Sequence, residues 1–198
     1  MHPQIHHSGG HSGCIRIINR HRKKQMEEDF KKALEGALGR KYIDSIVEQV
    51  MDSPARFDHL YALTRHEDKK IAWRATWACE KLSILAPSLL INKREELMQR
   101  AIQCPHDGIR RLLLNTLLHL PVSEPINVAF FDFCLNGMLS PAESVAGQAV
   151  CMKLAYTICL KEPELMGELE AYLQNMEPEY YTAAVQCARN NILKKIRK

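Results

Sequence analysis

The stretch "DGIRRLLLNTLLHLP", residues 107–121, decides the fold because an earlier stretch of the chain repeats its plan. The earlier stretch, "DKKIAWRATWACEKLSILAP", covers residues 68–87. Both begin with Asp, place an Arg a few residues later, continue in helix-forming residues and end at a Pro. A repeat of about forty residues is typical of proteins that stack helical units. The echo therefore predicts a tandem-repeat architecture.

The apolar residues of both stretches recur with the period of an α-helix. From Met26 onward this pattern is almost unbroken, and no segment alternates as a strand would. Pro and Gly with Asp, Ser or Asn nearby mark the breaks, as they do at helix ends. The pattern predicts ten helices, roughly over residues 27–38, 40–51, 55–66, 69–85, 87–103, 107–119, 124–138, 142–161, 163–175 and 178–197.

The predicted connections are short enough that consecutive helices must run antiparallel. From residue 55 the helices form pairs that begin near residues 55, 87, 124 and 163. One helical hairpin cannot bury its apolar face alone, so each hairpin covers its neighbour. We therefore expect an all-α fold, a right-handed α-α superhelix of stacked antiparallel hairpins, in a single domain over residues 26–198.

The first 25 residues differ in kind from the rest of the chain. They hold five of the nine His residues, five basic residues and no acid. Such a composition buries too little apolar surface to offset the entropy of ordering, so it predicts a disordered leader. The His residues and Cys14 lack the tight spacing of a metal site, and we expect neither a metal nor a cofactor.

The remaining composition limits the function classes. The 198 residues carry 27 Lys and Arg against 23 Asp and Glu, but without the leader the balance is 22 against 23. The seven Cys residues show no CxxC pair, which favours reduced thiols inside a cell. No apolar run is long enough to be a signal peptide or a bilayer-spanning helix. These features predict a cytoplasmic protein.

The residues of the repeats carry a resemblance to a known family. "IAWRATWACEKL" and "GIRRLLLNTLLHL" resemble the second helix of HEAT-like (ARM-type) repeats, over about residues 40–198, whereas "SVAGQAVCMKLAYTI" lacks the Asp and the Arg. In such repeats the Asp and the Arg commonly form a ladder between adjacent units. The chain is also similar to small bacterial HEAT-like proteins that sometimes carry the label adenylosuccinate lyase. We do not expect that activity, because the SSxMPxKxN loop of the lyases is absent.

The resemblance implies a scaffold that binds a protein or peptide partner on its concave face. The candidate binding residues are Trp73, Arg74, Arg110 and Arg111. Trp73 and Trp77 lie one turn apart, which fits either an aromatic platform on that face or packing against the next hairpin. A homo-oligomer formed through an exposed end hairpin is a further expectation for a stack.

The sequence favours a protein without catalytic activity, and its motifs indicate no catalytic residue. Gly-rich phosphate loops, GxSxG and HExxH are all absent. Cys104 and His106 lie two residues apart and would suit a nucleophile and a base only if their side chains converged. The alternative is a nucleic-acid-binding or DNA-glycosylase-like HEAT protein. The near-neutral charge of the chain after residue 25 disfavours it, because phosphate contacts dominate DNA affinity.

Overall fold

The computed structural model describes residue 25, residues 28–36 and residues 39–197. All regular structure in this part of the chain is helical, as predicted, and none of it is strand. The predicted leader lies outside the described residues except for Gln25, so the leader stays a prediction. The chain divides into two compact units, residues 1–75 and 76–198, and each is described by itself. The right-handed superhelix and the single domain stay predictions.

The first unit consists of short helices. Residues 28–35 form a helix, followed by α2 (Arg40–Asp52), the 3-10 turn η1 (Pro54–Arg56) and α3 (Phe57–Leu63). The unit ends within α4 (Lys69–Leu85), which continues into the second unit. Apolar side chains that recur at helical spacing are buried here, among them Leu34, Ile46, Val50, Leu60 and Ile71.

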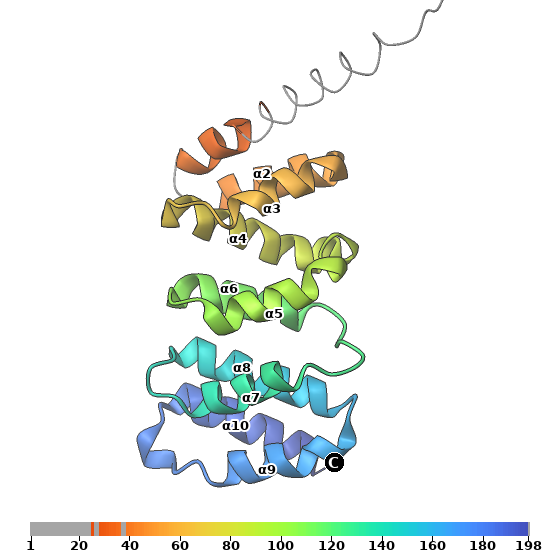
Figure 1. The fold of residues 1–198 in the computed structure, drawn as a ribbon. Helices are drawn as coiled ribbons and strands as arrows, with labels where there is room; N and C mark the ends of the chain where they lie inside the picture. The colour runs from red at the N-terminus through yellow and green to blue at the C-terminus, as the bar shows by residue number, and fades with distance from the viewer. Residues whose placement is uncertain (1–24, 26–27, 37–38, 198) are drawn as a thin grey trace, which may run out of the picture. The chain divides into compact units, whose positions relative to one another are not determined.

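The second unit contains three helical hairpins, which are visible in green to blue in Figure 1. They are α5 (Arg94–Gln103) with α6 (Asp107–Leu118), α7 (Val128–Leu139) with α8 (Val145–Cys159), and α9 (Met166–Gln174) with α10 (Ala183–Ile196). Helix α8 packs against both α6 and α10, and α5 packs against α7. The second helices therefore form one layer and the first helices another. Short 3-10 turns precede three of these helices. Turns η2 (Pro87–Leu89) and η3 (Ile91–Lys93) precede α5, η4 (Pro163–Leu165) precedes α9, and η5 (Pro178–Tyr180) precedes α10.

Side-chain caps decide where the second-unit helices begin. The side chains of His106, Asn127, Ser144 and Thr182 accept hydrogen bonds from backbone amides in the first turns of α6, α7, α8 and α10. These caps satisfy amides that have no partner inside the helix. From the prolines at 125, 141 and 178, the sequence predicted helix starts at residues 124, 142 and 178. Helices α7, α8 and α10 begin three to five residues later than these predicted starts.

One position repeats in all three second helices. Arg110, Gln148 and Gln186 each lie three residues after the first residue of their helix. Each donates to a backbone carbonyl of the turn that precedes it: Cys104 O at 2.8 Å, Ser140 O at 2.9 Å, and both Pro178 O at 2.8 Å and Tyr181 O at 2.9 Å. We call these three residues the turn donors. Each of these bonds ties the first turns of a second helix to the hairpin turn before it.

The first turn donor also joins two hairpins. Arg110 Nε lies 2.7 Å from Glu143 Oε1, which belongs to the turn of the next hairpin, and Arg110 Nη2 lies 3.7 Å from Asp107. The side chain of Glu143 is only 8% exposed. Both side chains are largely buried, so water and salt screen this ion pair less than one on the surface. Asp107 belongs to the same helix as Arg110, so the pair that joins the two hairpins is Arg110–Glu143, and the expected Asp–Arg ladder between adjacent units stays a prediction.

Helices α7 and α8 approach most closely at Gly137. A Cβ added at this residue would lie 2.9 Å from Cys151 Sγ, closer than carbon and sulfur can pack. Both Gly137 and Cys151 are buried. The absence of a side chain at Gly137 is thus what allows the two helices of this hairpin to meet.

We expect Gly137→Ala to lower the free energy of unfolding by about 1–3 kcal/mol, because the added methyl overpacks the α7–α8 contact. Urea unfolding followed by circular dichroism measures this loss. Gly167→Ala in α9 is the control, since a Cβ there meets nothing within 4 Å and Ala favours a helix. The double variant Gly137→Ala/Cys151→Ala should lose less than the sum of its single variants, and simple additivity would contradict the contact.

We expect Arg110→Met to lower the free energy of unfolding by about 2 kcal/mol, because it leaves Cys104 O and Glu143 without their charged donor. The control is Arg111→Met, the next residue of α6. Arg111 makes no hydrogen bond or ion pair within the described part of the chain, so its loss should change stability by less than about 0.5 kcal/mol. Equal urea midpoints for the two variants would show that Arg110 does not hold the hairpins.

Candidate functional site

The structure divides the four predicted binding residues between the two units. Trp73 and Arg74 belong to the first unit and Arg110 and Arg111 to the second. Arg74 is buried and donates to the carbonyls of Leu34 and Gly36 at the end of the first helix. It therefore supports the fold of the first unit. Trp73 is half-buried on α4.

The neighbouring arginines of α6 have different environments. Arg110 is the turn donor and its guanidinium contacts Cys104, Asp107 and Glu143. Arg111 is half-buried on the outer side of α6 and makes no such contact with the described residues. Of the two, Arg111 is thus the one whose charge is available to a ligand.

Arg111 belongs to a surface formed by the second helices. We define the second-helix face as the half-buried and exposed residues Arg111 and Asn115 of α6, Lys153 and Tyr156 of α8, and Asn191 and Lys195 of α10. The residues that follow Arg111, Lys153 and Asn191 in these helices are Leu112, Leu154 and Ile192, and all three are buried, so the face lies beside the buried side of each helix.

The helices of this face run in step. Each hairpin reverses the chain, so α6, α8 and α10 run in the same direction, as Figure 1 shows. Lys195 Nζ lies 5.6 Å from the ring centre of Tyr156, in a cation–π contact. Lys195 lies twelve positions after the first residue of α10, and Tyr156 lies eleven positions after the first residue of α8. In the same numbering, Asn115, Lys153 and Asn191 each lie eight positions from the start, so they form a row across the face.

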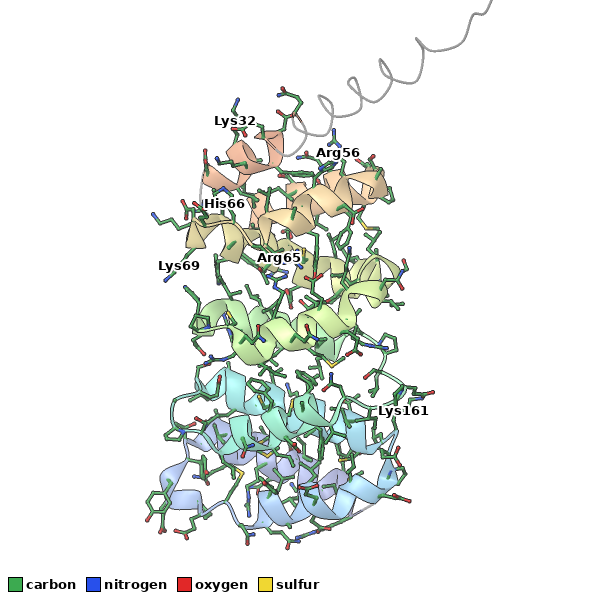
Figure 2. All side chains as sticks on the ribbon, viewed as in Figure 1. Lys32, Arg56, Arg65, His66, Lys69 and Lys161 are labelled. Carbon is green, nitrogen blue, oxygen red and sulfur yellow. The ribbon has the colours of Figure 1, made fainter. Side chains whose placement is uncertain are left out.

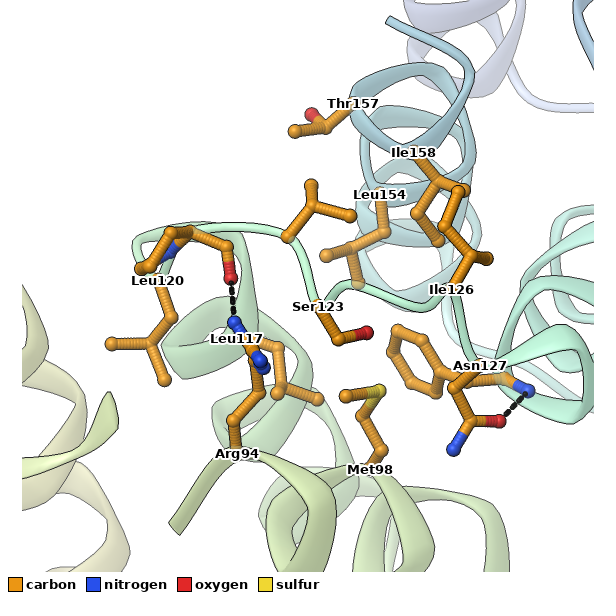
Figure 3. Close-up of a pocket in the computed structure, with 13 residues that line it drawn as sticks. Arg94, Met98, Leu117, Leu120, Ser123, Ile126, Asn127, Leu154, Thr157 and Ile158 are labelled. Atoms are coloured by element: carbon orange, nitrogen blue, oxygen red, sulfur yellow. Dashed lines mark hydrogen bonds between the residues drawn. The ribbon is translucent and has the colours of Figure 1, made fainter. Parts of the chain in front are cut away.

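A pocket lies beside this layer, under the connection of residues 119–127 (Figure 3). Its lining is mainly apolar and includes Met98, Leu117, Phe130 and Leu154, with the Ser123 side chain pointing into it. Arg94 Nη1 bridges the mouth to Pro121 O at 2.8 Å. The pocket encloses about 400 Å³ together with the solvent at its mouth, and about 30 Å³ of it is open to the centre of a water-sized sphere. That is room for one or two water-sized groups, such as the end of one side chain.

Sequence reasoning missed this pocket because it extended the seventh helix back to residue 124. The connection instead remains irregular up to the cap at Asn127, whose side chain accepts from Phe130 N at 3.0 Å and donates to Glu95 at 3.2 Å. The signal was present in the sequence as two prolines, Pro121 and Pro125, only four residues apart. Such spacing is typical of a connection and not of a helix start.

The side chains of Cys104 and His106 do not converge as a nucleophile and a base. His106 Nδ1 accepts from Ile109 N as the cap of α6, and Cys104 Sγ donates to the carbonyl of His106 and not to its ring. Burial raises the pKa of Cys79 to about 12 and, together with Glu168, that of Cys159 to about 11. Burial and the contact with Cys151 also raise the pKa of Cys134. A nucleophilic thiol needs the opposite shift.

Among the described residues, no three His, Cys, Asp or Glu side chains are placed to share a metal ion. No described helix has the length and apolar character needed to cross a membrane. The five His residues of the predicted leader lie outside the described residues.

Comparison with known proteins agrees with the repeated hairpins. A family model described as a HEAT repeat domain matches residues 30–196, which includes all three hairpins of the second unit and residues 30–75 of the first unit. No curated protein and no solved structure shows a significant match. Because the family model covers most of the sequence, the chain belongs to the HEAT repeat family.

Proposed function

We propose that this protein is a non-catalytic HEAT repeat scaffold that binds a protein or peptide segment on the second-helix face. The observation that carries the proposal is the row of Asn115, Lys153 and Asn191 across three helices that run in step. The hairpins hold these side chains on a preorganised wall, so a bound segment orders little of the scaffold.

The division of labour among polar residues supports the same function. Arg74 and Arg110 are engaged in closing turns, whereas Arg111 and Lys153 make no polar side-chain contact within the described residues. Polar side chains that the fold does not use are available for recognition. Among the residues predicted from the sequence, Arg111 therefore contributes most directly. The participation of Trp73 stays a prediction.

The face also offers both kinds of hydrogen-bonding group that an extended peptide needs. An Asn amide donates and accepts, which matches the alternating N–H and C=O groups of a peptide backbone. Tyr156 adds an aromatic surface next to Lys195, and aromatic side chains are common at the centres of protein interfaces.

The test substitutes two exposed asparagines, one in the layer of second helices and one in the layer of first helices. Asn191→Trp places a bulky neutral side chain on the second-helix face, and Asn136→Trp places the same side chain on α7 in the other layer. Both amides bond within their own helix, to Cys187 Sγ and to Asp132 O, so neither change removes a contact between helices. We expect affinity capture from native cells with the tagged full chain to lose a partner with Asn191→Trp and keep it with Asn136→Trp.

Quantitative mass spectrometry of the captured proteins measures the difference, and circular dichroism confirms that both variants fold. Equal capture by both variants would show that the second-helix face is not the binding surface. Loss with Asn136→Trp alone would assign binding to the first-helix layer.

A further inference from the structure

Charge separates between the two layers of the second unit. The second helices α6, α8 and α10 contain six basic residues and one acid: Arg110, Arg111, Lys153, Arg189, Lys194, Lys195 and Asp107. The first helices α5, α7 and α9 contain five acids and two basic residues: Glu95, Glu96, Asp132, Glu168, Glu170, Arg94 and Arg100. The near-neutral total charge hides this separation, because the net negative charge of the first helices offsets much of the net positive charge of the second helices.

Not all of the six cations are available to a ligand. Arg110 pairs with Asp107 and Glu143, and Arg189 donates to the carbonyls of Leu173 and Gln174 at the end of α9. The remaining four are Arg111, Lys153, Lys194 and Lys195, which have no acidic partner within the described residues. Their positive charge is therefore uncompensated on the surface of this layer.

We infer that the segment bound by the second-helix face is acidic, a stretch of protein rich in Asp and Glu. This inference rests on the proposed function and adds the chemistry of the partner. Four cations on three adjacent helices attract a polyanion at long range and pair with its carboxylates on contact. Asn115 and Asn191 of the row lie among these cations, and their amides hydrogen-bond the backbone of the segment.

The same observations favour a peptide over a nucleic acid. DNA affinity comes mainly from phosphate contacts, and proteins that bind it firmly make about six to ten of them. The face holds three uncompensated cations, Arg111, Lys153 and Lys195, and even with Lys194 of α10 the four are too few for such binding. Neutral amides and one Tyr between the cations match a peptide with spaced carboxylates better than a continuous phosphate backbone.

The test compares charge reversal on and off the face in the full chain. Lys153→Glu reverses a cation at the centre of the face. Lys161→Glu makes the same change in net charge in the turn after α8 (Figure 2), where Lys161 lies 3.9 Å from Glu124 and both side chains are exposed. The probe is a fluorescein-labelled peptide of twelve glutamates, and fluorescence anisotropy measures its dissociation constant at low and high salt. Duplex DNA of matched length and a neutral Gly–Ser peptide are the comparison ligands.

We expect the glutamate peptide to bind more tightly than the DNA, and Lys153→Glu to weaken its binding at least about fivefold, the effect of losing one surface ion pair. Lys161→Glu should change it less than twofold, and salt should weaken it. Equal weakening by both variants, tighter binding of DNA, or no binding of the peptide would each overturn the inference. If the peptide fails to bind but Asn191→Trp still abolishes capture, the proposed function stands and only the acidity of the partner is wrong.

Discussion

Each hairpin of the second unit depends on one hydrogen-bonding position, the turn donor at the start of its second helix. A backbone carbonyl in a turn is satisfied by water or by a donor of the protein. Arg110, Gln148 and Gln186 donate to carbonyls of the turn before their own helix. Because the donor comes from the second helix and the acceptor from the preceding turn, the bond also sets how the two helices of a hairpin meet. The α7–α8 hairpin, which lacks the Asp and Arg of the α5–α6 hairpin, keeps this bond through a Gln.

The turn donors also explain how structure and recognition can coexist on one helix. On α6, Arg110 points to the turn and to Glu143, while Arg111 is left to solvent. The same separation recurs on α8, where Gln148 is buried and Lys153 is exposed. Side chains on the turn side hold the fold, and side chains on the outer side are free to vary without loss of stability.

Much of the fold follows from periodicity alone. The predicted helices 69–85 and 107–119 agree with α4 (Lys69–Leu85) and α6 (Asp107–Leu118), because an Asp and a long apolar stripe mark them clearly. Later starts were misplaced at prolines, since a proline can open a 3-10 turn as readily as an α-helix, as at Pro178. The roles of the arginines could not be read locally. Nothing near Arg110 in the sequence shows that Glu143, more than thirty residues later, will meet it, so the distinction between Arg110 and Arg111 appears only once the hairpins are packed.

The Arg110–Glu143 contact bears on how such a chain can change in length. Gln148 and Gln186 are neutral and complete their bonds within their own hairpin, so these two turn donors need no counter-ion from a neighbouring hairpin. The α5–α6 hairpin ends instead in a cation whose counter-ion belongs to the module after it. A duplicated hairpin inserted between α6 and α7 would strand a carboxylate in the interior, whereas one inserted between α8 and α9 would separate no ion pair of this kind. A hairpin can therefore be added to the array more readily between α8 and α9 than between α6 and α7.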